Sequence, residues 1–127
     1  MTLRLPLLLL TALLAVAGLT LVRPVEAAAP SRVFITATEH HLGLSRTSVK
    51  AGTLIVQMRN QGEDLHDVQL VRLSRTGRAT GRTYRMRTLA PGELGELTLR
   101  VRAGRYRLTC TIAGHARMGM RATLRVR

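Results

Sequence analysis

Short runs of alternating apolar and polar residues, separated by turn signals, fill the chain after residue 30. In the clearest run, 97–101, leucine and valine side chains alternate with Thr98 and Arg100. A period of two residues is typical of a half-buried β-strand, because successive side chains point to opposite faces of a sheet. Such runs recur about every 8–12 residues, with Gly, Asn or Pro between them. This spacing predicts an all-β sandwich of seven to eight strands, without a competing helical period.

The alternation also places the individual strands and loops. Loops are expected at 60–65, directly before the strand that carries His66, and at 111–120, directly after the strand that carries Cys110. We interpret 74–82, which holds two glycines and three arginines, as a solvated connection. The main strands are predicted at 33–38, 53–59, 66–73, 83–88, 97–101, 106–110 and 123–126.

The first 27 residues have the features of a secretory signal peptide. Arg4 is followed by an uncharged, mostly apolar run at 5–22, and small residues around Ala27 offer a cleavage site. We expect a signal peptide at 1–27 and one mature domain at 28–127. The alternative is an uncleaved anchor, since 18 residues are at the lower limit for spanning a bilayer. In both cases the domain is exported, to the periplasm or another extracytoplasmic space.

The chain is strongly basic, with a net charge of +13, and removing residues 1–27 leaves +12. Export and an aromatic content of only 2% argue against a nucleic-acid binder, because such proteins stack bases on aromatic side chains. The charge instead favours an acidic protein partner or an anionic membrane surface. Five arginines in the segment 75–87 are candidates for this contact, or else form a solvated basic face. They are Arg75, Arg78, Arg82, Arg85 and Arg87.

The single cysteine, Cys110, narrows the chemistry further. In an exported protein a lone cysteine indicates an intermolecular bridge, a reactive thiol or a metal-bound thiolate. It excludes cysteine-rich zinc sites and iron–sulfur clusters built from this chain alone.

Cys110 shares one short segment with an imidazole, His115, and a thioether, Met120. Soft sulfur and nitrogen ligands suit copper, and two histidines, one cysteine and a weak axial methionine form the blue-copper electron-transfer site. The second histidine must come from elsewhere in the sandwich. His66, directly after the 60–65 loop, is the well-placed candidate.

The segment Asn60-Gln-Gly-Glu-Asp-Leu-His66-Asp67 resembles the corresponding part of the small cupredoxins, which include plastocyanin- and halocyanin-like proteins. Cys110, His115 and the pair Gly119-Met120 are similar to the ligand loop of that family. Shorter pieces at 48–52, 89–92 and 104–106 are also family-like, and the resemblance covers 33–127 in the family's order.

The resemblance implies a Greek-key β-sandwich that binds one type 1 copper through His66, Cys110, His115 and Met120. It further implies a monomeric one-electron carrier, which cycles between Cu(I) and Cu(II) and exchanges electrons with a redox partner such as a cytochrome or an oxidase. His115 would lie nearest the surface, within a patch of small and apolar residues. Asp67 and Thr111, which follow two of the ligands, would link the two ligand loops by hydrogen bonds.

Two choices remain open within the site. Met118 is an alternative axial ligand, but the family loop places that ligand after Gly119, which favours Met120. The segment Glu39-His40-His41 could bind a stray metal ion. Because neighbouring residues of a strand face opposite sides, we expect a solvated histidine pair instead.

Two other functions compete with the electron carrier. The same residues could hold Cu(I) for delivery to another protein, or the fold could serve as a metal-free interaction domain. An enzyme is not expected, since no Ser-His-Asp set, glycine-rich phosphate loop or paired-carboxylate signature is present.

Overall fold

The structure is a computed structural model that describes residues 28–127. The predicted signal peptide at 1–27 lies outside the described residues. Within them the chain forms nine β-strands and no helix. The strands are β1 (Ser31–Thr38), β2 (His41–Leu44), β3 (Ser48–Val49), β4 (Gly52–Asn60), β5 (Gln69–Leu73), β6 (Ala79–Arg85), β7 (Leu94–Val101), β8 (Gly104–Thr109) and β9 (Arg121–Val126).

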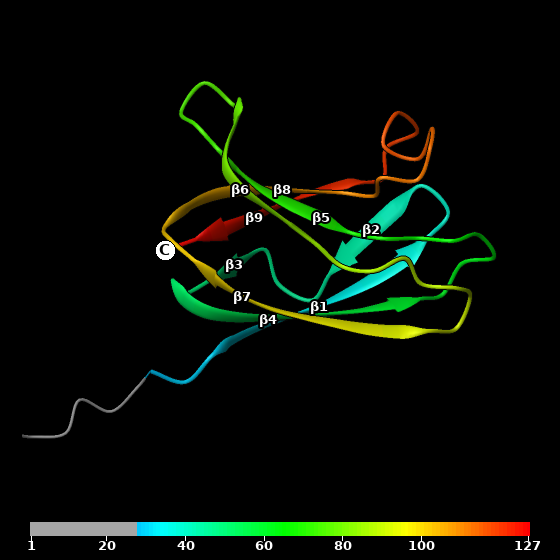
Figure 1. Cartoon of the computed structure of the whole chain (residues 1–127), viewed down its shortest axis with the longest axis horizontal. Helices are drawn as coiled ribbons and strands as arrows, with labels where there is room; N and C mark the ends of the chain where they lie inside the picture. The colour runs from blue at the N-terminus through cyan, green and yellow to red at the C-terminus, as the bar shows by residue number, and fades with distance from the viewer. Residues whose placement is uncertain (1–27) are drawn as a thin grey trace, which may run out of the picture.

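The strands form two sheets that face each other, as Figure 1 shows. One sheet has the order β2-β1-β4-β7 and the other β3-β9-β8-β5-β6. Each sheet is mixed, because β1 pairs with β4 and β3 with β9 in parallel, whereas the other pairs are antiparallel. The chain crosses between the sheets several times, so the predicted all-β Greek-key sandwich is confirmed.

The core lies between the sheets and follows from the alternation in the sequence. On β4, Leu54, Val56 and Met58 are fully buried, and every second residue between them faces outward. Leu70 on β5 and Leu108 on β8 are fully buried in the other sheet. Full burial of one such side chain stabilises the fold by roughly 1.5–3 kcal/mol. The core therefore forms from aliphatic side chains with few aromatics.

Nine strands exceed the seven to eight predicted, and the short edge strands β2 and β3 account for the difference. The bounds of β6 also differ from the prediction. β6 begins at Ala79, inside the segment that we interpreted as a connection, and it ends at Arg85, before the predicted end at Thr88. Its side chains are exposed except for the half-buried Tyr84, so the sequence shows no apolar alternation there. β2 has only four residues, too few for a recognisable period.

The sandwich has two ends with different loops. The β1–β2, β4–β5, β6–β7 and β8–β9 connections gather at one end, which we call the site end because His66, Cys110 and His115 lie there. The β3–β4, β5–β6 and β7–β8 turns lie at the opposite end. No helix long and apolar enough to cross a bilayer occurs in residues 28–127.

Candidate metal centre

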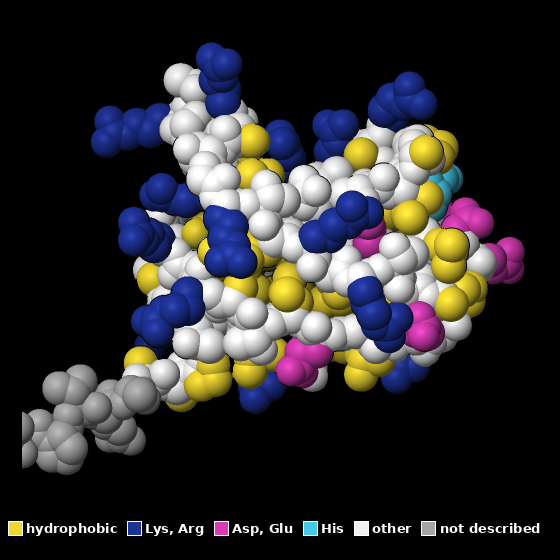
Figure 2. Space-filling view, in the orientation of Figure 1, with side chains coloured by type: hydrophobic (Ala, Val, Ile, Leu, Met, Phe, Trp, Pro, Cys, Tyr) yellow, Lys and Arg dark blue, Asp and Glu magenta, His cyan; other side chains and the backbone are white. Residues whose placement is uncertain are grey.

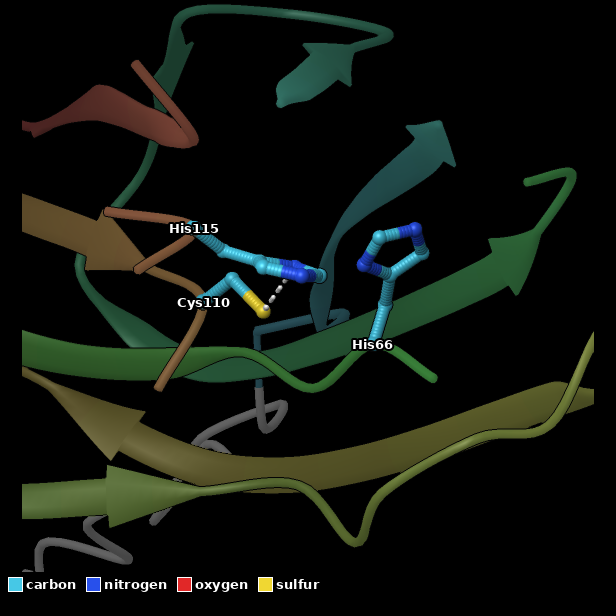
Figure 3. Close-up of side chains that lie close together, drawn as sticks. All are labelled: His66, Cys110 and His115. Carbon is cyan, nitrogen blue, oxygen red and sulfur yellow. Dashed lines mark hydrogen bonds between the residues drawn. The ribbon is translucent and has the colours of Figure 1, made fainter. Parts of the chain in front are cut away.

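Three of the predicted ligands come together at the site end. One donor atom from each of His66, Cys110 and His115 lies within 4.8 Å of the other two, and all three side chains are buried. Cys110 Sγ is 3.7 Å from His115 Nδ1, and the ring centroids of His66 and His115 are 5.1 Å apart. Figure 3 shows Cys110 and His115 on the β8–β9 connection and His66 on the β4–β5 connection, with the three side chains close together. One ion could contact all three donors.

The loop between β8 and β9 positions the second half of the site. The Cys110 N–H donates to the Met120 carbonyl at 3.2 Å, and the Met120 N–H donates to the His115 carbonyl at 3.0 Å. These bonds bring both ends of the loop together. Gly114 and Gly119 have φ angles of +86° and +106°, which glycine adopts without strain. A glycine at position 119 therefore allows the turn that places Met120 beside Cys110 and His115.

The two candidate methionines differ in burial. Met120 is fully buried, in the same core cluster as Cys110, whereas the side chain of Met118 is 53% exposed. An axial ligand has to face the buried donors. The difference therefore favours Met120, the residue preferred from the sequence.

The loop before His66 is held by a buried asparagine. Asn60 Nδ2 donates to the Asp64 carbonyl at 2.7 Å and to the Leu89 carbonyl at 3.0 Å. Asn60 Oδ1 accepts the Gly62 N–H at 2.9 Å. His66 does not open β5 as predicted but forms an isolated bridge with Leu89. The strand prediction was wrong there because the asparagine turn and the bridge replace regular pairing before β5 begins at Gln69.

Glu39 is a site neighbour whose role the sequence did not reveal. Its Oε1 accepts the N–H groups of Glu63 at 2.6 Å and Asp64 at 3.3 Å, and it lies 3.7 Å from His66 Nε2. Backbone hydrogen bonds, from its own N–H and then from Glu63 and Asp64, lower the pKa of Glu39 to about 2. Glu39 thus ties the β1–β2 turn to the loop that carries His66.

The neighbouring histidines are both exposed, which confirms the expected solvated pair. His40 lies in the β1–β2 turn with a φ angle of +61°, and His41 begins β2. The ring of His40 is 5.7 Å from that of His115, in an edge-to-face arrangement. His40 therefore borders the buried cluster without joining it.

Asp67 and Thr111 form the predicted link between the two ligand loops. The Thr111 N–H donates to Asp67 Oδ1 at 2.6 Å, and the Thr111 hydroxyl donates to Oδ2 at 2.5 Å. The link has a third member, since Arg85 Nη2 and Nε donate to Asp67 Oδ2 at 2.7 and 3.1 Å. Burial would raise the pKa of Asp67, but the bonds from Thr111 and Arg85 outweigh it and lower this pKa.

The chemistry of these residues fits one type 1 copper ion. Both ring nitrogens of His66 are buried without a hydrogen-bond partner in the described residues, although buried polar groups are normally paired. Burial, and then the nearby His115, lower the pKa of His66, so its imidazole is neutral and free to bind a metal. Burial also raises the pKa of the Cys110 thiol. Two imidazoles, a thiol and the Met120 thioether form the donor set that copper prefers.

His115 is the candidate ligand nearest the surface, as the resemblance implied. It is 7% exposed, whereas His66, Cys110 and Met120 are fully buried. Around it the loop exposes the small or apolar residues Ala113, Met118 and Gly119. On another side Asp64 Oδ2 lies 4.0 Å from His115 Nε2.

This sandwich, with its buried cysteine, histidine and methionine side chains, has the cupredoxin fold. Among solved structures, residues of this chain superpose on auracyanin B with a TM-score of 0.62 and 23% identity, over 80% of this chain and 91% of that protein. Auracyanin A, a "blue" copper protein from the green thermophilic photosynthetic bacterium Chloroflexus aurantiacus, has a TM-score of 0.59 and 19% identity, over 78% and 100%.

Rusticyanin from Thiobacillus ferrooxidans has a TM-score of 0.62 and 16% identity, over 80% of this chain and 79% of that protein. Neither the protein-family models nor the curated protein sequences give a match. At these identities the likeness establishes the fold. The function has to be argued from the site.

Proposed function

We propose that the protein is a type 1 copper protein that carries single electrons, with His66, Cys110, His115 and Met120 as ligands. The observation that carries this proposal is the buried His66 ring. Both of its nitrogens are without a partner in the described residues, and it lies next to a buried cysteine and a second histidine. A bound metal would satisfy a nitrogen that otherwise carries the full free-energy penalty of desolvation.

Copper would supply a one-electron redox couple. The protein's own residues would keep the ligands in place while the electron is gained or lost. Cys110 and His66 lie on different connections, which Asp67 and Thr111 hold together. Burial keeps water away from Cys110 and Met120. A ligand set fixed in this way rearranges little when an electron arrives or leaves, and preorganisation of this kind speeds the transfer.

The surface around His115 supports electron exchange with another protein. The edge of this ring reaches the surface, and exposed Met118 and Leu65 provide apolar contact area on the loops beside it. Interfaces commonly place apolar residues at their centre and charged residues at the rim. We further propose that the domain works outside the cytoplasm and meets its redox partner through this surface.

A copper titration tests the proposal. The purified protein should bind one Cu(II) per chain and become intensely blue, because thiolate-to-Cu(II) charge transfer absorbs visible light. Cys110→Ser should remove the colour, since a hydroxyl is a poor and harder ligand. A strong blue band in that variant would exclude Cys110 as the ligand. Failure of the unaltered protein to bind copper would favour a metal-free interaction domain.

Copper delivery is tested in the same samples. A delivery protein should pass Cu(I) rapidly to a competing Cu(I) chelator, whereas an electron carrier should release the ion slowly and retain it through repeated oxidation and reduction. Bathocuproine absorbance against time separates the two outcomes. Retention of copper with reversible bleaching and recovery of the blue colour supports the electron carrier.

A further inference from the structure

Acidic side chains are confined to one half of the domain. All of those in residues 28–127 lie on the connections of the site end, apart from Glu96. Glu96 is on β7 two residues after Leu94, which begins this strand at the site end. The acidic residues are Glu39, Glu63, Asp64, Asp67, Glu93 and Glu96. The opposite end of the sandwich therefore has no negative side chain among the described residues.

That opposite end carries basic side chains from several connections and from the adjoining strand ends, and we call it the Arg pole. Pairing of Gly52 with Val101 and of Gly104 with Val126 brings these connections together. Every basic side chain of the Arg pole is exposed. In Figure 2 dark blue side chains surround the left end, whereas magenta side chains appear only toward the right and lower parts. The Arg pole consists of Lys50, Arg72, Arg75, Arg78, Arg102, Arg105 and Arg127.

The five arginines of the segment 75–87 do not form one surface. Arg85 is bound to Asp67, and Arg87 pairs with Glu93 at 2.9 Å, both in the half that holds the site. Arg75 and Arg78 lie on the β5–β6 turn at the Arg pole. No ion pair involves the Arg pole within residues 28–127, so its charges are available to an external partner.

Two open surface hollows border the Arg pole, and arginine side chains line both of them. A hollow of about 310 Å³ lies between β6 and β7 and is lined by Arg72, Arg82, Arg100 and Arg102 together with Tyr84 and Tyr106. A second hollow, of about 470 Å³, is lined by Arg72, Arg75 and Arg105 among others. Guanidinium groups bind phosphate oxygens through paired hydrogen bonds.

We propose that the Arg pole binds an anionic phospholipid surface and thereby points the site end away from the membrane. The exposed large apolar residues of the described chain are Phe34, Leu65, Leu94 and Met118, and none belongs to the Arg pole. A protein interface normally has an apolar or aromatic centre. Nucleic-acid binding by stacking is equally unsupported, because Tyr84 and Tyr106 are half-buried and buried. A charged layer of phosphate headgroups requires neither feature.

The distance between the two ends is larger than the range of the membrane's electrostatic field, so binding through the Arg pole would fix the orientation of the domain. β8, which connects the Arg pole to Cys110, has six residues and spans roughly 20 Å at about 3.4 Å per residue. The Debye length at physiological ionic strength is about 8 Å. Basic residues at the site end would therefore lie outside the strong part of the membrane field when the Arg pole is in contact. The proposal does not depend on which metal the site binds.

Vesicle cosedimentation of the full chain tests the proposal. Binding is measured on phosphatidylcholine vesicles and on vesicles with 30% phosphatidylglycerol. The gain is the ratio of the two binding constants, anionic to neutral. Neutral vesicles account for any binding through apolar segments. Changing Arg75, Arg78 and Arg105 to Gln should lower that gain by on the order of 100-fold, because each cation near an anionic surface contributes separately. Raising the salt concentration should lower it as well.

The matched control removes the same charge from the site end, through Arg59→Gln, Arg117→Gln and Arg121→Gln. This variant should keep most of the gain. Equal losses in both variants would show that net charge alone attracts the protein to lipid, which would overturn the proposal. No gain on anionic vesicles would also overturn it and would direct attention to an acidic protein. Circular dichroism and melting curves confirm that each variant is folded.

Discussion

Asp67 and Thr111 lie 44 positions apart in the chain and are joined by two hydrogen bonds to the two oxygens of one buried carboxylate. Each residue directly follows a candidate ligand, His66 in one case and Cys110 in the other. The pair therefore fixes the distance between two ligand-bearing connections. Arg85 reaches the same carboxylate from β6 and partly neutralises it.

Replacing Arg85 should weaken both the fold and the candidate copper site. In Arg85→Gln the buried Asp67 carboxylate loses a charged donor, and hydrogen bonds to charged groups contribute about 1.5–3 kcal/mol. We expect a loss of free energy of unfolding of that order, measured by urea denaturation of the metal-free protein. In the copper form the uncompensated negative charge should stabilise Cu(II) and so lower the reduction potential, measured by voltammetry.

Arg87→Gln is the matched control. Arg87 is also in an ion pair, but both Arg87 and Glu93 are largely exposed at 59% and 42%. Exposed pairs contribute only about 0–1 kcal/mol. This variant should change neither stability nor potential appreciably. Equal effects of the two substitutions would contradict the role that we assign to Arg85.

Part of the network around Asp67 could be predicted from the sequence and part could not. The candidate ligands and the Asp67–Thr111 link were predicted because they rest on short segments with family-like spacing. The part played by Arg85 could not be predicted, since it depends on the β5–β6 register, in which Arg85 pairs with Gln69, two positions after Asp67. β6 itself was misplaced, because an exposed edge strand lacks the apolar alternation that marks a buried one.

The role of Glu39 could not be predicted from the sequence either. Its sequence context, Glu39-His40-His41, suggested a solvated histidine pair or a site for a stray metal ion. Its contacts are with the N–H groups of Glu63 and Asp64, which β1–β4 pairing brings near. Contacts of a side chain with a distant backbone leave no periodic signal in the sequence.

The two methionines of the ligand loop should respond differently to substitution. Met120→Leu should keep the blue colour and raise the reduction potential, because loss of a weak thioether donor disfavours Cu(II). An apolar replacement of similar volume costs less than about 1.5 kcal/mol, so the variant should fold. Met118→Leu, at an exposed position, should leave spectrum and potential nearly unchanged. The opposite pattern in visible spectra and voltammetry would assign the axial role to Met118.

Gly62 should resist even a methyl group. A Cβ at this position would overlap Glu39 Oε1 and lie 2.8 Å from His66 Nε2. Gly62→Ala should therefore displace the loop, cost roughly 1–3 kcal/mol in stability and weaken copper binding. Gly43→Ala is the control, since its Cβ would meet no atom closer than 3.4 Å. Copper affinity that is unchanged in Gly62→Ala would show that the loop adapts freely.

The ionised Glu39 should stabilise the metal-free fold above its ordinary pKa and lose this effect in acid. Its pKa is about 2 in the folded protein, compared with an ordinary value of 4.5. Above pH 4.5 both folded and unfolded states are ionised, and the contribution is fully present. As the pH falls toward 2, the unfolded chain takes up the proton first, so the contribution disappears.

Urea denaturation at several pH values from 7 to 2.5 measures this loss. The free-energy difference between the unaltered protein and Glu39→Gln should be constant above about pH 5 and shrink steadily below pH 4.5, because only the unaltered protein carries the titrating carboxylate. Glu63→Gln is the control, since it removes a carboxylate from the adjoining loop but leaves Glu39 in place as the acceptor of the two backbone hydrogen bonds. A difference for Glu39→Gln that stays the same down to pH 2.5 would mean that the bonds to Glu63 and Asp64 do not favour the ionised carboxylate, and Glu39 would then only fill space beside His66.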